Sequence, residues 1–307
     1  MKIKHLRPLE GKKGWMPFPS MRCFVFLVVL FGSSISGCTS SPSTQSDGQV
    51  IVTTMPVLGL IISPIAETYT VDILLKNGQS PHGFQISPSQ AKTLSAMDLL
   101  VYAHPDIDGW ATDLASENAI PLWGEVEVEG EGHQSSAHDA HYWTDPVAVL
   151  DALQTFSDAL CERQPLNCVD YRRNANAFSV RIDSIQTQIG AQLESIKEQC
   201  FVVAQPFMTQ FLDRFDVASV GPLQPLPGHD ASPKTLGEHI KQAKNAGCET
   251  LLVQEAVDNQ AMVALAKDMD VKLVEVDPLG ARAPTYEQYL LNLALALTGK
   301  STPGGTL

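Results

Sequence analysis

Positive charge is scarce in this chain beyond its first residues. The 307-residue sequence holds 21 Lys and Arg against 34 Asp and Glu, which gives a formal net charge of −13. Residues 1–22 contain six basic residues and one acidic residue, so the rest of the chain carries −18. A body this acidic repels phosphate backbones, which argues against nucleic acid as a partner, and it attracts cations.

Common hydrolytic and nucleotide-binding motifs are also missing. The sequence contains no HExxH, no GxSxG and no P-loop, so metalloprotease, serine hydrolase and nucleotide chemistry have no support. The cysteines form no CxxC motif, which removes the usual sequence signal of a structural zinc or redox site.

The apolar run near the N-terminus is too short to span a bilayer. It covers nine residues, 23–31, and follows the basic segment 1–22. It precedes Ile35-Ser36-Gly37-Cys38, which resembles the lipobox of a bacterial lipoprotein signal. We therefore predict that residues 1–37 are a signal peptide, that Cys38 is lipidated, and that residues 38–49 are a flexible tether. The alternative is an ordinary secretion signal followed by a chance cysteine.

Four cysteines remain after Cys38, an even number that favours disulfides in an exported chain. Three pairings are possible. We favour Cys161–Cys168, which brackets a short turn, and Cys200–Cys248, because each of these two cysteines lies just ahead of a strand-like run. The alternative is four buried thiols.

Short apolar runs alternate with helix-period segments, which predicts an α/β protein with two similarly wound parallel-sheet lobes. The first lobe is residues 50–168 and the second is residues 200–307. Helices are expected after Ser87-Pro88, where Gln90 completes a capping box, and after Ser232-Pro233. The expected strands are Val50–Thr53, Val71–Leu75, Asp98–Ala103, Phe201–Ala204, Val217–Gly221, Thr250–Val253 and Val271–Val276.

One long amphipathic helix is predicted between the lobes, over residues 169–199. Apolar residues recur there at three- and four-residue spacing, and the segment has no proline. A helix of that length would act as a stiff spine. The metal site of such a protein is expected in the cleft between the lobes.

An acidic segment rich in glycine and histidine covers residues 124–140. It includes His133 and His138 among several acidic residues, and its composition predicts a mobile loop. This loop could capture zinc near the cleft as an auxiliary site. The alternative is a plain solvated run of charge.

Several metal-type donors follow predicted strands, where ligands bind in parallel α/β sheets. They are His82, His104, Gln205, Glu255 and Asp277, and His141 lies where the acidic segment re-enters folded structure. A lone loop histidine is more often a surface residue than a ligand. Two histidines and an aspartate at strand ends of facing lobes make a metal site a serious hypothesis.

From residue 50 to residue 297 the chain resembles the metal-specific substrate-binding proteins of bacterial ABC transporters. These form the zinc/manganese receptor family with a rigid backbone helix. The resemblance rests on Val52-Thr53-Thr54, on Ser80-Pro81-His82-Gly83-Phe84, on His141-Tyr142-Trp143-Thr144-Asp145-Pro146 and on Val276-Asp277-Pro278-Leu279-Gly280. It implies that His82, His141 and Asp277 are metal ligands.

The chain departs from the family at its third ligand. The family places His or Glu after the first strand of the second lobe, and this chain has Gln205 there. A neutral amide oxygen is a weaker donor to Zn²⁺ than imidazole or carboxylate. Three outcomes stay open: a weakened zinc site with Gln205 as the fourth ligand, a changed metal preference, or recruitment of His229 or Glu255.

The resemblance implies an extracytoplasmic, membrane-anchored receptor that delivers a divalent metal to an ABC permease. We expect a monomer without enzymatic activity, with zinc favoured and manganese or iron as the alternative cargo. Two rival interpretations belong to other classes. One is a degenerate, non-binding lipoprotein or adhesin, and the other is an extracytoplasmic metallohydrolase with Glu255 as its base.

Overall fold

Two four-stranded parallel sheets organise the chain. The computed structural model describes residues 48–76, 78–123, 140–224, 232–255 and 259–299. The first sheet has the order β2-β1-β3-β4 and the second has the matching order β6-β5-β7-β8. Because each order reverses direction beside its first strand, both sheets have a switch point where ligands commonly bind. The predicted fold class is confirmed.

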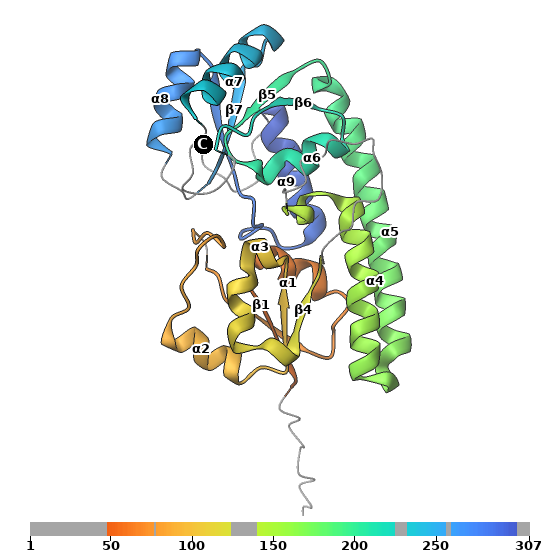
Figure 1. Cartoon of the computed structure of the whole chain (residues 1–307). Coiled ribbons are helices and arrows are strands. Elements are labelled where there is room, and N and C mark those ends of the chain that lie inside the picture. The colour runs from red at the N-terminus through yellow and green to blue at the C-terminus, as the bar shows by residue number, and fades with distance from the viewer. Residues whose placement is uncertain (1–47, 77, 124–139, 225–231, 256–258, 300–307) are drawn as a thin grey trace, which may run out of the picture. The chain divides into compact units, whose positions relative to one another are not determined.

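The first lobe contains β1 to β4 and the helices around them (Figure 1). Buried β1 and β3 lie at its centre, and their apolar residues form contiguous runs because both faces of the sheet are covered. Its elements are β1 (Val50–Thr53), α1 (Pro56–Ile62), β2 (Thr70–Ile73), α2 (Pro88–Ser95), β3 (Leu99–Tyr102), α3 (Pro105–Asp108) and β4 (Ala119–Pro121).

The second lobe repeats this winding. Its helix α7 begins at Ser232, whose hydroxyl accepts a hydrogen bond from the Thr235 amide, and ends at left-handed Gly247. Its elements are β5 (Cys200–Val203), α6 (Thr209–Arg214), β6 (Ala218–Val220), α7 (Pro233–Ala246), β7 (Thr250–Gln254), α8 (Gln260–Met269), β8 (Lys272–Val276) and α9 (Tyr286–Thr298).

The spine consists of two helices, α4 (Pro146–Arg163) and α5 (Cys168–Leu193), which lie side by side in Figure 1. The predicted helix 169–199 is present, but its α-helical part ends at Leu193 and a 3₁₀ turn continues from Glu194 to Ile196. The periodic pattern of α5 did not indicate that α4 would pack along it.

Both predicted disulfides are confirmed. Cys161 and Cys168 are joined across the turn between α4 and α5, with their Cα atoms 4.5 Å apart. Cys200 and Cys248 are joined beside the neighbouring strands β5 and β7, with their Cα atoms 4.3 Å apart. The first bond closes the spine hairpin and the second ties the start of the second sheet.

A continuous hydrophobic core runs from the first lobe through the spine into the second. It includes Ile51 of β1, Phe178 of α5, Phe201 of β5 and Tyr286 of α9. The rings of Phe178 and Tyr286 meet edge to face, with centroids 6.1 Å apart. The two sheets and the spine therefore share one core. None of the helices in the described ranges is both long and apolar enough to cross a membrane.

Candidate metal site

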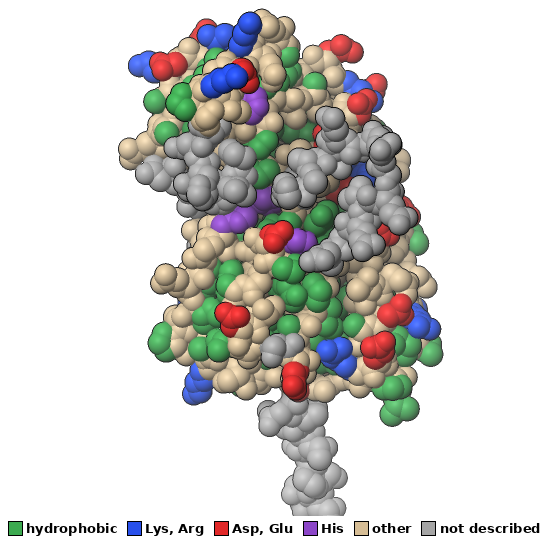
Figure 2. Space-filling model, in the orientation of Figure 1, with side chains coloured by type: hydrophobic (Ala, Val, Ile, Leu, Met, Phe, Trp, Pro, Cys, Tyr) green, Lys and Arg blue, Asp and Glu red, His purple; other side chains and the backbone are tan. Residues whose placement is uncertain are grey.

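His82 and His141 form a pair of imidazoles, with ring centroids 5.6 Å apart. His82 lies in the loop between β2 and α2, and His141 immediately precedes the 3₁₀ turn Tyr142–Thr144. His141 is buried and His82 is partly buried. Figure 2 shows histidine side chains gathered at the hollowed waist of this face. Two histidines far apart in the sequence thus lie close together, and their role as metal donors remains a prediction.

The surroundings of His82 keep its imidazole neutral. Burial, followed by the nearby His141, lowers the pKa of His82 from 6.5 to about 4. A metal ion binds the unprotonated imidazole, so it has no proton to displace from His82 at neutral pH.

Aromatic residues fix the loop that carries His82. The indole nitrogen of Trp110 donates a 2.8 Å hydrogen bond to the carbonyl of Pro81, the residue before His82. The Phe84 ring packs against Trp110 with centroids 4.9 Å apart. These contacts hold a segment that has little secondary structure of its own.

His104, another predicted strand-end donor, has a structural role. It is buried at the N-terminus of α3, and its Nδ1 accepts a 3.2 Å hydrogen bond from the Asp106 amide. Its ring centroid lies 6.1 Å from that of Tyr142. A cap of this kind uses one nitrogen to satisfy a free helix amide.

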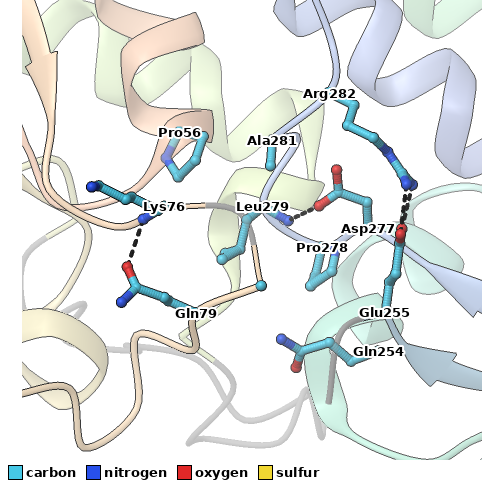
Figure 3. Close-up of a pocket in the computed structure, with 11 residues that line it drawn as sticks. Pro56, Lys76, Gln79, Gln254, Glu255, Asp277, Pro278, Leu279, Ala281 and Arg282 are labelled. Carbon is cyan, nitrogen blue, oxygen red and sulfur yellow. Dashed lines mark hydrogen bonds and ion pairs between the residues drawn. The ribbon is translucent and has the colours of Figure 1, made fainter.

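Asp277 lies at the end of β8 and lines a cavity of about 270 Å³ (Figure 3). Its Oδ1 accepts a 3.0 Å hydrogen bond from the Leu279 amide, which fixes the carboxylate against the following turn. Gly280 in this turn has a φ of 64°, and a Cβ there would come within 3.0 Å of the Tyr289 ring. Glu255 lines the same cavity and is bound to Arg282.

Gln205 follows β5 as predicted, but other groups hold its amide. Its Nε2 donates a 2.8 Å hydrogen bond to Oε1 of Gln224, and its Oε1 accepts a 3.3 Å hydrogen bond from the Gln254 amide. Gln205 does not line the cavity that contains Asp277, whereas Gln254 and Glu255 do.

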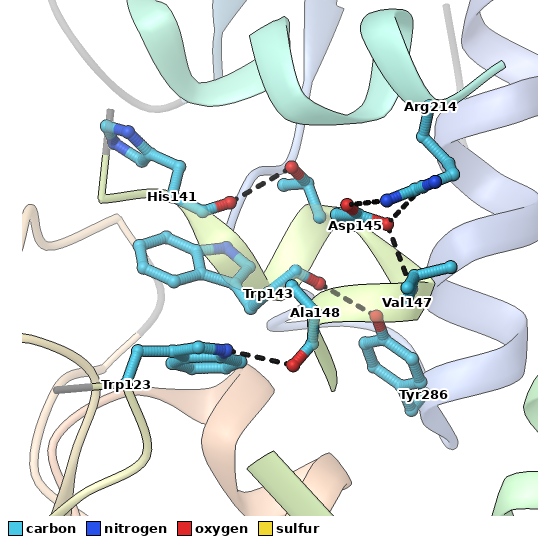
Figure 4. Close-up of polar contacts among 9 residues, drawn as sticks. Trp123, His141, Trp143, Asp145, Val147, Ala148, Arg214 and Tyr286 are labelled. Atoms are coloured by element: carbon cyan, nitrogen blue, oxygen red, sulfur yellow. Dashed lines mark hydrogen bonds and ion pairs between the residues drawn. The ribbon is translucent and has the colours of Figure 1, made fainter. Parts of the chain in front are cut away.

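Hydrogen bonds connect the His141 segment to the second lobe (Figure 4). The Trp143 indole donates to the carbonyl of Pro278 at 2.7 Å. The Tyr286 hydroxyl donates to the carbonyl of Trp143 at 2.9 Å, as Figure 4 shows. Asp145 caps α4 by accepting from the Val147 amide and forms a two-pronged ion pair with Arg214 of α6. The motif of residues 141–146 predicted a functional segment, but it did not predict the contacts with Pro278, Tyr286 and Arg214.

The described residues bring the two histidines together without assembling a complete metal cage. Among them, no three His, Cys, Asp or Glu side chains form a group that could hold a metal ion. The two imidazoles form one cluster. Asp277 and Glu255 line a cavity between the lobes, to which the first lobe contributes Pro56, Lys76, Gly78 and Gln79. His133, His138, His229 and Cys38 lie outside the described residues.

Comparisons with known proteins agree on one family. The model of the family described as zinc-uptake complex component A, periplasmic (ZnuA) matches residues 51–298. The manganese-binding lipoprotein MntA of Halalkalibacterium halodurans is 22% identical over 280 residues, covering 87% of this chain and 93% of MntA. The zinc-binding protein AdcA of Streptococcus pyogenes is 22% identical over 270 residues, covering 78% of this chain and only 52% of AdcA.

Solved structures show the same architecture. The laminin-binding protein Lmb of Streptococcus agalactiae has a TM-score of 0.68 at 22% identity, covering 82% of this chain and 98% of Lmb. A crystal structure of ZnuA has a TM-score of 0.69 at 20% identity, with the same two coverages. At these identities the likeness concerns the fold.

Proposed function

This chain belongs to the family of periplasmic zinc-uptake complex component A proteins, and we propose that it is an extracytoplasmic receptor for a divalent transition metal. The observation that carries the proposal is the His82–His141 pair, in which the pKa of His82 is lowered enough to keep that imidazole unprotonated. Such a receptor binds a scarce cation and hands it to an ABC permease, which requires no catalytic step.

The metal is held by His82 and His141 from one side and by Asp277 from the second lobe. Asp277 is a fixed carboxylate at a strand end, in the region where parallel α/β sheets bind ligands. The sequence assigns the fourth position to Gln205, with His229 or Glu255 as the alternative donor.

Zinc is the favoured cargo and manganese the alternative. Two imidazoles suit zinc, whereas carboxylate oxygens suit manganese as well. Relatives named for each metal match the chain at similar identity, so the donors of this chain decide the preference.

The receptor is anchored outside the cytoplasm by lipid on Cys38, acts as a monomer, and consists of a tether, residues 38–49, two lobes and the linking spine. Relatives described as lipoproteins support the anchor. The rival metallohydrolase would need Glu255 as its base, and a hydrolysis screen on generic ester and phosphoester substrates, in which a receptor is inert, separates the two.

Metal analysis of the purified protein tests the proposal. The chain without residues 1–37 is stripped with a chelator, reloaded with zinc or manganese, desalted and analysed by mass spectrometry for metal content. We expect close to one tightly held equivalent. Absence of any retained metal would overturn the receptor and support the non-binding lipoprotein.

A further inference from the structure

Glu255 and Asp277 stand side by side at the carboxyl edge of the second sheet. Strands β7 and β8 are parallel neighbours in a register that pairs Gln254 with Val276, so the next residue on each strand is a carboxylate. The Glu255 amide donates a 2.8 Å hydrogen bond to the carbonyl of Val276, which continues the pairing to this point. Backbones of neighbouring strands lie about 4.8 Å apart. Two like charges this close repel each other unless a cation lies near them.

Arg282 supplies that positive charge. Its guanidinium makes two contacts with the Glu255 carboxylate, one to each oxygen. Arg282 belongs to the segment that follows Asp277, and all three residues line the same cavity (Figure 3). The side chain of Arg282 is 62% exposed and that of Glu255 is 29% exposed. Exposed ion pairs contribute little to stability, so a divalent cation can displace the guanidinium.

We propose that Glu255, rather than Gln205, supplies the fourth metal donor, and that Arg282 is a resident counter-cation which the metal displaces. The Gln205 amide is held at both ends by Gln224 and by the Gln254 backbone. Glu255 lies in the cavity beside Asp277 and carries a charge. This inference rests on the proposed function, because it concerns the same metal.

A fourth donor that is Glu255 instead of Gln205 changes the charge of the site. Two imidazoles with two carboxylates give a ligand charge of about −2, whereas an amide in place of Glu255 gives about −1. The added carboxylate compensates for the missing histidine of the family and increases the affinity for manganese relative to zinc. Glu255 is therefore a specificity-determining residue for the metal.

Competition titrations against a metal-binding dye, with zinc and with manganese, test the proposal in three variants of the receptor. Glu255→Gln should weaken binding by at least about tenfold, and more for manganese than for zinc. Arg282→Gln should tighten binding about two- to fivefold, since the competing cation is gone. Gln205→Ala should stay within about twofold of wild type. Arg172→Gln, which removes an exposed ion pair with Asp158 on the spine, is the matched control for loss of an arginine.

Thermal unfolding adds an independent measurement. Without metal, Arg282→Gln should unfold at a lower temperature than wild type, because Glu255 and Asp277 then repel each other. With saturating zinc the two proteins should unfold at similar temperatures, so the metal-induced shift is larger in the variant. If zinc raises the unfolding temperature equally in wild type and Arg282→Gln, the metal does not displace Arg282 and this part of the proposal is overturned.

The outcomes separate this inference from the proposed function. If wild type binds metal and Glu255→Gln binds it with the same affinity, Glu255 is not the fourth donor. A tenfold loss of affinity in Gln205→Ala would likewise overturn Glu255 as the donor. Both results leave the receptor function intact. If the wild-type protein itself binds no metal, the proposed function fails.

Discussion

The indole nitrogen of Trp143 donates a 2.7 Å hydrogen bond to the carbonyl oxygen of Pro278, across 135 residues of sequence. Trp143 is fully buried and lies two residues after His141, and Pro278 directly follows Asp277. The bond therefore connects the segments that carry two proposed ligands from different parts of the chain. It sets their separation before any metal is present.

Replacing Trp143 by Phe should weaken metal binding about two- to tenfold, which corresponds to one net hydrogen bond. The aromatic ring is retained in the core, but the link to Pro278 is lost. Isothermal titration with zinc measures the change.

The Tyr289 hydroxyl provides the matched control for Trp143, because it donates a 2.9 Å hydrogen bond to the same Pro278 carbonyl from within the second lobe. Tyr289→Phe should lower stability in a similar way but change zinc affinity by less than about twofold, since the link to the His141 segment remains. Equal losses of affinity in both variants would contradict the positioning role of Trp143.

The low pKa of His82 predicts a loss of stability in acid for the metal-free protein. The pKa of His82 is about 4 in the folded chain against 6.5 for the unperturbed side chain, so between these values the unfolded chain binds more protons. Stability should therefore fall as pH drops from 6.5 to 4, by at most about 3 kcal/mol. Urea unfolding of wild type and His82→Gln across this range measures the difference. A pH dependence that His82→Gln fails to reduce would exclude His82 as its source.

Asp145 should be important for stability, because its buried carboxylate caps α4 and binds Arg214 through both oxygens. Asp145→Ala leaves a helix end and a guanidinium unsatisfied, and we expect a loss of about 3 kcal/mol in the free energy of unfolding. The exposed pair Asp158–Arg172 is the control, and Asp158→Ala should unfold like wild type. If Asp145→Ala and Asp158→Ala lose similar free energy of unfolding, the buried Asp145 ion pair stabilises the protein no more than the exposed pair.

Local sequence signals predicted much of the fold. The capping box at Ser87 and Gln90 is present with both of its hydrogen bonds, because a cap depends only on neighbours along the chain. The central strands β1, β3, β5 and β7 appear within two residues of their expected bounds, because strands buried on both faces form contiguous apolar runs. The Cys161–Cys168 disulfide followed from two cysteines that bracket a short turn, and Cys200–Cys248 from two cysteines just ahead of strands.

Features that depend on distant partners could not be predicted. Strand β4 has only three residues, Ala119–Pro121, and is too short to produce a pattern. The sequence placed Gln205 correctly at a strand end but gave no sign that Gln224 and Gln254 would hold its amide. The pairing of Arg282 with Glu255 likewise arises only when the loop after β8 folds back.

Membrane attachment through Cys38 is a prediction from the lipobox. Cys38→Ala should move the protein from the membrane fraction into the soluble fraction of the producing cells, because the residue that accepts the lipid is gone. Immunoblots of washed membranes check this. A variant that stays with the membrane through a high-salt wash would place the anchor elsewhere.

The most direct test of the receptor is a zinc competition titration of the double variant His82→Ala, His141→Ala beside wild type. His239→Ala, which changes a histidine of α7, controls for the loss of an imidazole. Wild type and His239→Ala should each bind one equivalent tightly, and the double variant should bind none at that affinity, because both nitrogen donors are gone. Full stoichiometric binding by the double variant would contradict the assignment of the metal to this pair.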